Sequence, residues 1–521
     1  MTPIKSATSK EKKLVAITFS NTVVLFEGAM SYSGGLPAHS FNKLPSKVRK
    51  YILPLEQTIE SCGQRIAGLE SRVKDLEGQL AQNSQNSSKP PSSDGPKGRS
   101  IPGSQRGKTG KKPGGQPGHP GTTLRRVKNP DRIVTHTVEK CQHCDHCLSG
   151  VKSHSTEERQ VTDLPQLKLE VTSHIVESKE CPNCEKTTTA SFPPGVDNPV
   201  GYGPRIKAFG IYLTQQQLLP CKRASGIIED LFGHTISAGT FCDWAKTASE
   251  NLSLYERVVI KMLGQSPVAH FDETGMRCEK IRHWLHVCST QHLTLYSFDK
   301  KRGEDAMREM GILPVFTGVA VHDHWKPYFL FEGCSHSLCN SHHLRELKFL
   351  YEEHGETWAA EMRDLLQEIH QTVEEAKVTG KDELSQSIRQ EYIKAYERIL
   401  KKGYSYHDKL TPLLSSGDRG RKKQRKGKNL LDRLREFNGA VLRFMNNFQI
   451  PFTNNQGEQD IRMTKVKQKI SGCFRSFEGA LYFCRIRGYL STGRKQGWNL
   501  LSSLEQVFRG QPILPVRALT S

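Results

Sequence analysis

A basic stretch rich in glycine and proline divides this chain and excludes a single continuous core. Residues 89–128 contain ten Lys or Arg residues and one Asp, with Gly and Pro throughout. So few apolar side chains cannot offset the entropy of folding, and we expect a disordered linker. Its cations could neutralise phosphates, although a merely solvated linker is an equally good interpretation. The chain must therefore fold as separate parts.

The net charge and the cysteine content indicate which partners the protein binds and in which compartment it folds. The 521 residues include 75 Lys and Arg against 54 Asp and Glu, a net charge of +21. This excess favours a nucleic-acid partner, with a soluble basic protein or a binder of acidic membranes as alternatives. The 14 cysteines are too dilute for a disulfide scaffold, which indicates a reducing compartment and metal ligation.

The N-terminal stretch KEKKLVAITFSNTVVLFEGAM places lysines ahead of an apolar patch, as a signal peptide does. Asn21 and Glu27 interrupt the patch and no convincing cleavage site follows, so we expect no secretion and a poorly ordered extension over residues 1–45. No apolar run reaches the roughly 18 residues that suggest a membrane span. These features predict a cytoplasmic protein without a membrane partner.

A heptad pattern predicts a coiled-coil, leucine-zipper-like segment. Apolar residues recur at alternating steps of three and four, which gives the narrow seam that a parallel or antiparallel helix pair needs. Three glycines within it weaken the helix by up to ~1 kcal/mol each, so it should be stable when paired. The alternative is an amphipathic helix packed on its own domain. The seam consists of Ile52, Leu55, Ile59, Cys62, Ile66, Leu69, Val73, Leu76 and Leu80.

Two CxxC pairs predict a structural zinc site. Cys141 and Cys144 precede Cys181 and Cys184 by a 36-residue gap, and each short turn can present two thiolates to one Zn²⁺. The alternating sequence LPQLKLEVTSHIVESKE between them indicates strands and a zinc-ribbon-like outline. Four protein ligands leave no open position for chemistry. Further candidate ligands adjoin the first pair: His143, His146 and Cys147.

Beyond residue 200 the pattern changes from helices to strands. Residues 200–262 look helical, with Ser237 as a plausible N-cap. The runs PVAHFDETGMRC, HWLHVCST and LTLYSFD predict an antiparallel meander. A helix near Glu304 and a fourth strand in PVFTGVAVHDHW should follow. This order, continued by further helices, is that of an RNase H-like core.

Helices are expected over most of residues 338–447, interrupted by the cationic run RGRKKQRKGK at 419–428. The final helix should start near Asn454 or Asn455, either of which would cap it. Such a helix continues the α/β pattern and brings a further acid toward the sheet.

Three acids occupy positions that such a sheet could bring together. Asp272 is expected to end the first strand, Asp323 to end the fourth, and Glu458 to lie near the start of the later helix. Two Mg²⁺ ions (or Mn²⁺) ~3.5–4 Å apart on such acids can activate the attacking oxygen and stabilise the leaving oxygen in phosphodiester cleavage. Asp299 and Glu273 are substitutes, although strand alternation should point Glu273 away from Asp272.

The helix that carries Glu458 is otherwise basic. Arg462, Lys465 and Lys469 follow at steps of four, three and four, so they share one helical face with the acid. The acid could hold metal while these cations hold the DNA backbone. The alternatives are a buried salt bridge or a solvated face, with a Glu458–Arg462 pair contributing ~0.3–0.5 kcal/mol.

Several motifs together resemble the IS66-type bacterial insertion-sequence transposases. NSQNSSKPPSSDG, GGQPGHPGTTL, the paired CxxC motifs, HFDETGMR and TNNQGEQDIR occur in the order typical of that family, over about residues 45–510. The resemblance implies a leucine-zipper-like segment, a zinc finger and a DDE catalytic domain with a retroviral-integrase-like fold. It places the family's three acids on Asp272, Asp323 and Glu458.

Three motifs depart from the family pattern. DHWKPY replaces a DGY-like motif but keeps the acid and Tyr328. CNSHH replaces the C-W-A-H block but retains Cys339 and His342, which could brace the active site, add a small metal site or simply pack. The EQDIR sequence at 458–462 lacks one Arg of the usual E-R-x-I-R.

The resulting hypothesis is a nucleoid-associated bacterial transposase that binds the terminal inverted repeats of its element and catalyses metal-dependent DNA cleavage and strand transfer. It would act as a homo-oligomer, and the resemblance suggests accessory proteins from the same element. The alternatives are a catalytically decayed, repressor-like DNA-binding relative and a zinc-dependent scaffold. The expected parts are an extension (1–45), a coiled coil (46–85), a basic linker (86–130), a zinc-binding domain (131–195), a helical DNA-binding or connecting region (196–262), a catalytic domain (263–495, with a helical insertion at about 351–450) and a C-terminal segment (496–521).

Overall fold

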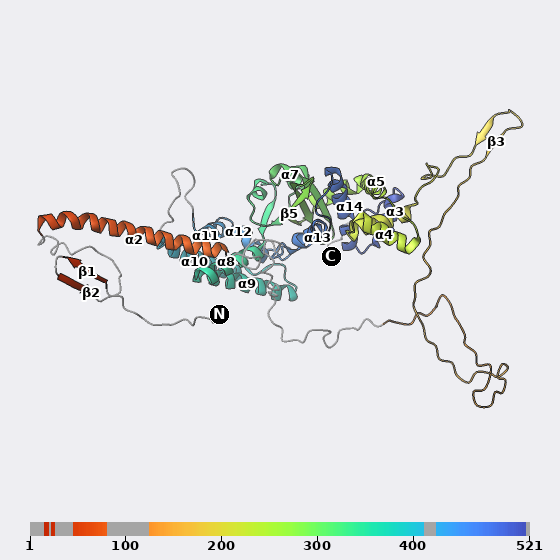
Figure 1. Ribbon diagram of the computed structural model, residues 1–521, viewed down its shortest axis with the longest axis horizontal. Helices are drawn as coiled ribbons and strands as arrows, with labels where there is room; N and C mark the ends of the chain where they lie inside the picture. The colour runs from red at the N-terminus through yellow and green to blue at the C-terminus, as the bar shows by residue number, and fades with distance from the viewer. Residues whose placement is uncertain (1–14, 20–21, 27–44, 81–123, 411–423, 517–521) are drawn as a thin grey trace. The chain divides into compact units, whose positions relative to one another are not determined.

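The computed structural model describes residues 15–19, 22–26, 45–80, 124–410 and 424–516. They belong to two compact units, one formed by Met1–Ala81 with Leu410–Arg425 and the other by Gln82–Lys409 with Lys426–Ser521 (Figure 1). Most of the predicted basic linker, and much of the cationic run at 419–428, lie outside the described residues. None of the helices in the described ranges is long and apolar enough to cross a membrane.

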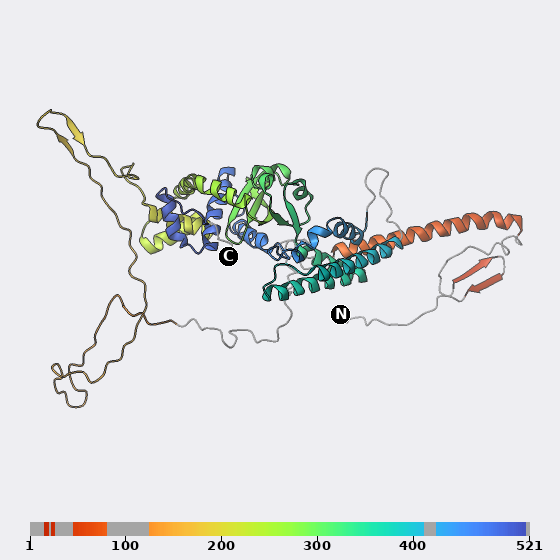
Figure 2. The ribbon, with the colours of Figure 1, turned by 180° about the vertical axis from the view of Figure 1, so that it is seen from behind.

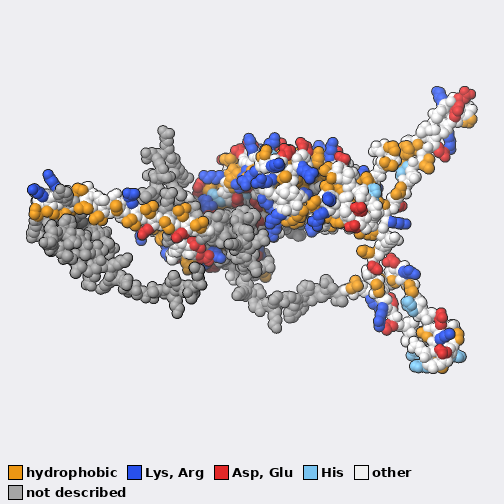
Figure 3. All heavy atoms as spheres, viewed as in Figure 1, with side chains coloured by type: hydrophobic (Ala, Val, Ile, Leu, Met, Phe, Trp, Pro, Cys, Tyr) orange, Lys and Arg blue, Asp and Glu red, His pale blue; other side chains and the backbone are white. Residues whose placement is uncertain are grey.

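The first unit contains a hairpin and one long helix. Strand β1 (Val15–Phe19) pairs antiparallel with β2 (Thr22–Phe26) in a segment where the sequence predicted no order. Helix α2 (Ser46–Leu80) carries the whole heptad seam on one continuous helix. Ile52 is half-buried, and the other seam positions are exposed, from 46% at Ile59 to 87% at Leu80. Figure 3 shows these apolar side chains along the helix.

Residues 124–199 are mostly extended and exposed. Strand β3 (Ser178–Glu180) pairs antiparallel with β4 (Thr187–Thr189), and an isolated bridge joins Lys140 to Cys147. The strand prediction for the run at 164–180 was therefore wrong except for its last three residues. Its alternating apolar side chains have no covering layer in this described stretch, since Val171 is 90% exposed.

The predicted helical region forms a cluster with the C-terminal end of the chain. It comprises α3 (Pro204–Ile211), a π-helical turn η2 (Tyr212–Gln216), α4 (Cys221–Phe232), α5 (Ala238–Asn251) and α6 (Ser253–Gly264). Ser237 caps α5 as predicted, because its Oγ accepts a hydrogen bond from the Thr240 backbone N–H (3.1 Å). Helix α3 packs against α15 (Leu500–Phe508), so segments about 300 residues apart in sequence share one core.

A five-stranded mixed sheet lies at the centre of the second unit. The meander is confirmed: β5 (Val268–Cys278), β6 (Ile281–Ser289) and β7 (Thr294–Asp299) pair antiparallel in that order. After α7 (Glu304–Glu309) and a 3-10 turn η3 (Leu313–Val315), β8 (Val319–His322) pairs parallel with β5, and β9 (Ser335–Leu338) pairs parallel with β8 beyond the 3-10 turn η4 (Lys326–Leu330). The strand order is β7-β6-β5-β8-β9.

Gly318 permits the close approach of β8 to β5. A Cβ atom at this position would lie 2.6 Å from the carbonyl oxygen of Pro267, a backbone atom at the start of β5. A side chain there would therefore force the two parallel strands apart.

The predicted helical insertion has an apolar core of its own. It comprises α8 (Asn340–His354), α9 (Thr357–Val378), α10 (Gln386–Asp408), α11 (Lys426–Glu436), α12 (Asn438–Val441) and a 3-10 turn η5 (Arg443–Met445). Trp358 and Leu366 from α9 meet Tyr396 from α10 and Leu431 from α11 in this core. Figures 1 and 2 both show α9 and α10 side by side.

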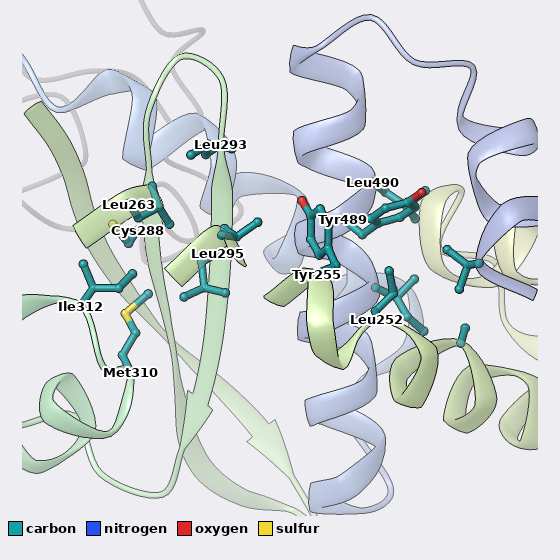
Figure 4. Packing of buried hydrophobic residues seen from close by; sticks show 14 of the residues in the cluster. Leu252, Tyr255, Leu263, Cys288, Leu293, Leu295, Met310, Ile312, Tyr489 and Leu490 are labelled. Carbon is teal, nitrogen blue, oxygen red and sulfur yellow. The ribbon is translucent and has the colours of Figure 1, made fainter. Parts of the chain in front are cut away.

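The last part of the chain covers the sheet. Helix α13 (Asn455–Ser471) begins where the sequence predicted, but it is not the final helix, since α14 (Phe477–Lys495) and α15 follow. Helix α14 packs on β7, and Tyr255 of α6 meets Tyr489 of α14 edge to face at 4.9 Å (Figure 4). The described chain is thus a mixed α+β protein whose core joins residues from 204 to 508.

Candidate active site and metal ligands

Two acids follow the paired stretch of the neighbouring parallel strands β5 and β8. β5 and β8 pair in a register that matches His270 with Val321. The pairing ends at this residue pair, and Asp272 and Asp323 each lie two residues beyond it along their own segments. They are close enough that, besides burial and Glu273, the charge of Asp323 raises the pKa of Asp272. Asp323 directly follows β8, as predicted. Asp272, in contrast, lies inside β5 rather than at its end, because β5 continues to Cys278 as a hairpin with β6.

Asn454 ties the start of α13 to this sheet. Its side-chain N–H donates to the carbonyl oxygen of Phe271 (2.7 Å), and its side-chain oxygen lies 2.8 Å from His270 Nδ1. Its backbone N–H donates to Sγ of Cys339 (3.1 Å). Asn454 occupies the predicted N-cap position, but its side chain bonds to the strand instead of capping the helix. These contacts fix the first turn of α13, and with it Glu458, beside β5.

Burial and mutual repulsion disfavour the charged form of all three acids. Burial, followed by the charges of Glu273 and Asp323, raises the pKa of Asp272 well above its ordinary value. Burial and then Glu273 raise the pKa of Asp323 to about 6. Burial also raises the pKa of Glu458, against the opposing effect of the Arg345 cation. A cation bound among such carboxylates would relieve this penalty.

The acids share one electrostatic neighbourhood without forming a tight cluster. Within the described ranges, the one group of candidate ligand atoms that all lie within 4.8 Å of one another is Cys339, His342 and Glu458. Glu458 Oε1 lies 4.0 Å from His342 Nδ1 and 3.9 Å from Arg345 Nη2. The Glu458 carboxylate is therefore directed to the start of α8. Asp272 Oδ1 and Asp323 Oδ1 instead accept hydrogen bonds from nearby backbone N–H groups, those of Glu273 (2.9 Å) and Trp325 (2.9 Å).

Glu273 is a buried acid whose partners sequence reasoning missed. Its side chain is 2% exposed, and its Oε1 accepts hydrogen bonds from Arg302 Nε (3.0 Å) and Nη2 (2.5 Å). Its Oε2 accepts a hydrogen bond from the Tyr328 hydroxyl (2.5 Å). The Arg302 guanidinium lies over the Trp325 ring at 3.9 Å. We call these contacts the Glu273–Arg302–Tyr328 clamp. The expectation that Glu273 points away from Asp272 did not predict it. The charge of Glu273 nevertheless adds to burial in raising the pKa of both Asp272 and Asp323.

Two family models match this chain. The model described as Transposase IS66 family matches residues 200–481, which is more than half of the chain and includes all three acids. The chain belongs to the IS66 transposase family. A family of unknown function (DUF6444) matches residues 51–125, from α2 into the basic linker. No curated protein matches the chain.

The basic residues that follow Glu458 differ in burial in this IS66 family member. Arg462 and Lys469 are exposed. Lys465 is half-buried, and its Nζ donates a hydrogen bond to the carbonyl oxygen of Gly275 on β5 (2.7 Å). Lys465 therefore braces α13 on the strand, whereas Arg462 and Lys469 present their charge to solvent. Figure 3 shows further Lys and Arg side chains across the visible face of the second unit.

The two CxxC turns share one backbone geometry. The residue after each second cysteine, Asp145 or Glu185, has a positive φ of 56° or 59°. Its backbone N–H donates to the carbonyl oxygen of the first cysteine, over 3.0 Å to Cys141 and 2.8 Å to Cys181. Two turns of the same form, far apart in sequence, indicate the same role for both cysteine pairs.

Backbone N–H groups also lower the pKa of the first thiol in each of these turns. N–H groups of His143 and Cys144 lower the pKa of Cys141, and the corresponding groups of Asn183 and Cys184 lower the pKa of Cys181. A thiolate stabilised in this way is the form that binds zinc. Within the described part of the chain, the four cysteines do not lie together in one ligand group. Their shared zinc site stays a prediction.

Proposed function

We propose that this IS66 family member is a DDE transposase that binds the terminal inverted repeats of its element and catalyses DNA cleavage and strand transfer. The observation that supports the proposal is that Asp272 and Asp323 each follow the paired stretch of the parallel strands β5 and β8 by two residues, with α13 anchored to β5 by Asn454. Three acids separated by up to 186 residues in sequence thereby share one electrostatic neighbourhood, in which, in addition to burial, Asp323 and Glu458 both raise the pKa of Asp272.

The sheet topology supports an RNase H-like, retroviral-integrase-like catalytic domain. Three antiparallel strands are followed by a helix and two parallel strands, in the spatial order β7-β6-β5-β8-β9. Parallel strands bring their carboxyl ends to the same edge of a sheet, and ligands bind there in open α/β sheets. Asp323 leaves β8 at this edge.

The proposed chemistry uses Asp272, Asp323 and Glu458 as ligands for two divalent ions, Mg²⁺ or Mn²⁺. When bound, such ions activate the attacking oxygen and stabilise the leaving oxygen of a phosphodiester. The protein would supply position and charge: the pairing of β5 with β8 holds the two segments that carry the aspartates, and Asn454 fixes the first turn of α13. The hydrogen bonds from Arg302 and Tyr328 to Glu273 link the residue after Asp272 to the segments that follow β7 and Asp323.

Other parts of the chain support DNA binding and assembly. Arg462 and Lys469 offer exposed cations on the helix that carries Glu458, and cations of this kind bind DNA phosphates. The exposed apolar seam of α2 suits pairing with a second copy of the chain. The two CxxC turns would hold a structural Zn²⁺. Proteins from the same element remain candidate partners.

The test is Asp272→Asn in the full-length protein, with DNA that carries the inverted repeats of the element. Cleavage with Mg²⁺ should fall by roughly 10³-fold or more, since losing a metal ligand removes several kcal/mol of transition-state stabilisation. Binding to the same DNA should persist, because the cations that hold phosphates are unchanged.

The matched control is Asp299→Asn, which changes another acid at a strand end of the same sheet. Asp299 Oδ1 accepts the Lys301 backbone N–H (2.6 Å), a bond that Asn can also accept. Its cleavage rate should stay close to that of the unsubstituted protein. Undiminished cleavage by Asp272→Asn would refute the catalytic assignment, and binding without cleavage by the unsubstituted chain would favour a decayed, repressor-like relative.

A further inference from the structure

A thiol, an imidazole and a carboxylate converge beside the three proposed catalytic acids. Cys339 is buried and stands at the N-cap of α8, His342 lies one turn into that helix, and Glu458 lies in the first turn of α13. One ligand atom from each residue lies within 4.8 Å of the others. Two helix starts that are 115 residues apart thus present three different ligand types to one point.

Two of these atoms are buried without a hydrogen bond. His342 Nδ1 and Glu458 Oε1 both lack a hydrogen-bond partner in the part of the chain that the structure describes, although they lie 4.0 Å apart. Leaving such an atom unsatisfied costs about 1–3 kcal/mol. The Arg345 guanidinium, 3.9 Å from Glu458 Oε1, offsets the charge of the carboxylate at a distance too long for a hydrogen bond. The pair of atoms therefore requires a partner that both can reach.

We propose that Cys339, His342 and Glu458 bind one transition-metal ion of the zinc class. A sulfur, nitrogen and oxygen donor set suits Zn²⁺, whereas Mg²⁺ takes oxygen ligands. Three protein ligands leave a fourth position open for water or for a phosphate oxygen. The Asn454 backbone N–H donates to Cys339 Sγ (3.1 Å) and opposes the rise in the thiol pKa that burial and then the charge of Glu458 cause. A bound cation would favour the thiolate. This proposed site shares Glu458 with the proposed catalytic site.

The experiment measures zinc content and Co²⁺ absorption in the full-length protein. Cys339→Ser and His342→Asn should each bind one metal ion fewer per chain, and the Co²⁺-loaded Cys339→Ser variant should lose part of its thiolate charge-transfer band. Ser can still accept the Asn454 N–H, so the fold has a conservative replacement. If that variant fails to fold, as judged by circular dichroism, His342→Asn carries the test.

The matched control is Cys334→Ser, a buried thiol five residues earlier whose Sγ contacts the Phe331 carbonyl oxygen. It should keep the full metal complement. Folded Cys339→Ser and His342→Asn variants that also keep it would overturn the inference. Asp272→Asn separates the two proposals, because it should abolish cleavage and leave the zinc content unchanged. Retained cleavage in that variant would remove the proposed function but not this site.

Discussion

The sheet-containing region and the cysteine-bearing segment obtain their order in different ways. Between residues 204 and 516 the chain buries apolar side chains from many elements, and Leu263 is 0% exposed. Between residues 124 and 199, Val161 and Val171 are 92% and 90% exposed. Burying one such side chain contributes about 1.5–3 kcal/mol. Packing can therefore hold the acids of the first region, whereas the exposed apolar side chains of the second contribute little of this kind.

The proposed metal ligands of the two regions also differ, in the direction in which their pKa values are shifted. Burial raises the pKa of Asp272 and Asp323, so packing forces these carboxylates into an environment that disfavours their charge. Local backbone donors lower the pKa of Cys141 and Cys181, which are close to solvent. In the sheet-containing region, a bound metal ion would offset the cost of burying carboxylate charges in a fold that packing already stabilises. In the cysteine-bearing segment, metal binding would itself contribute the free energy of folding.

The largest expected effect follows from replacing Cys181 with Ser. Structural zinc contributes about 10–16 kcal/mol in zinc-finger peptides at neutral pH, and the exposed side chains of residues 124–199 offer no comparable term. The variant should lose zinc and become more sensitive to proteolysis within that segment. The thermal unfolding of residues 204–516 should not change. Zinc analysis, limited proteolysis and calorimetry check these outcomes.

Cys242→Ser is the matched control, because Cys242 is an exposed thiol on α5 outside both CxxC turns. It should keep its zinc and its proteolysis pattern. Two results would contradict the claim that zinc stabilises residues 124–199 independently of the sheet-containing region. In the first, Cys181→Ser would keep its zinc and its proteolysis pattern like this control, and in the second it would lower the melting temperature of the sheet-containing region.

A smaller effect is expected from Gly318→Ala. The added methyl group would lie 2.6 Å from the Pro267 carbonyl oxygen, and only a separation of β5 from β8 can relieve that contact. We expect a loss of about 1–3 kcal/mol in the free energy of unfolding. Cleavage should fall as well, because Asp323 follows β8 and would move relative to Asp272. Thermal melting and a cleavage assay measure the two effects.

Gly303→Ala provides the comparison, since no atom lies within 4 Å of a Cβ built at Gly303 before α7. Its stability and activity should match those of the unsubstituted protein. Equal stability of the Gly318 and Gly303 variants would show that strand packing does not set the position of Asp323.

Local patterns in the sequence predicted much of this fold. The helix that carries the heptad pattern, the Ser237 cap and the β5–β7 meander each depend on residues close together in the chain, and the structure confirms these three. Strand β9 was missed because its sequence SHSL has no apolar run. The strands expected between the CxxC turns failed for the opposite reason, since their alternating pattern lacks a covering layer.

In the candidate site, too, local motifs could be predicted from the sequence and long-range contacts could not. The three acids could be chosen from motifs, but the residues that position them act over long sequence distances. Asn454 bonds to Phe271 across 183 positions, and Glu273 to Arg302 across 29. No short pattern marks such contacts. The CxxH spacing at Cys339 and His342 was visible in the sequence, whereas its third partner, Glu458, required the tertiary structure.

The smallest expected effect concerns the pH dependence of stability at Asp323. Its pKa is about 6 in the folded protein against an ordinary value of 3.8, so the folded state binds this proton more tightly than the unfolded chain. The resulting stabilisation is complete below about pH 4 and is lost as the pH rises through about 6. Without divalent ions, the melting temperature should therefore decrease across this window.

Magnesium should offset that loss, because the ionised carboxylate is the form that binds it. We expect Mg²⁺ to raise the melting temperature by a few degrees at about pH 7.5 and hardly at about pH 5. Asp323→Asn can still accept the Trp325 backbone N–H and removes the charge. Metal-free, it should melt above the unsubstituted protein at about pH 7.5 and gain less from Mg²⁺. A lower melting temperature with an undiminished gain from Mg²⁺ would mean that the buried acids do not repel one another, and the contrast with the thiols of Cys141 and Cys181 would be lost.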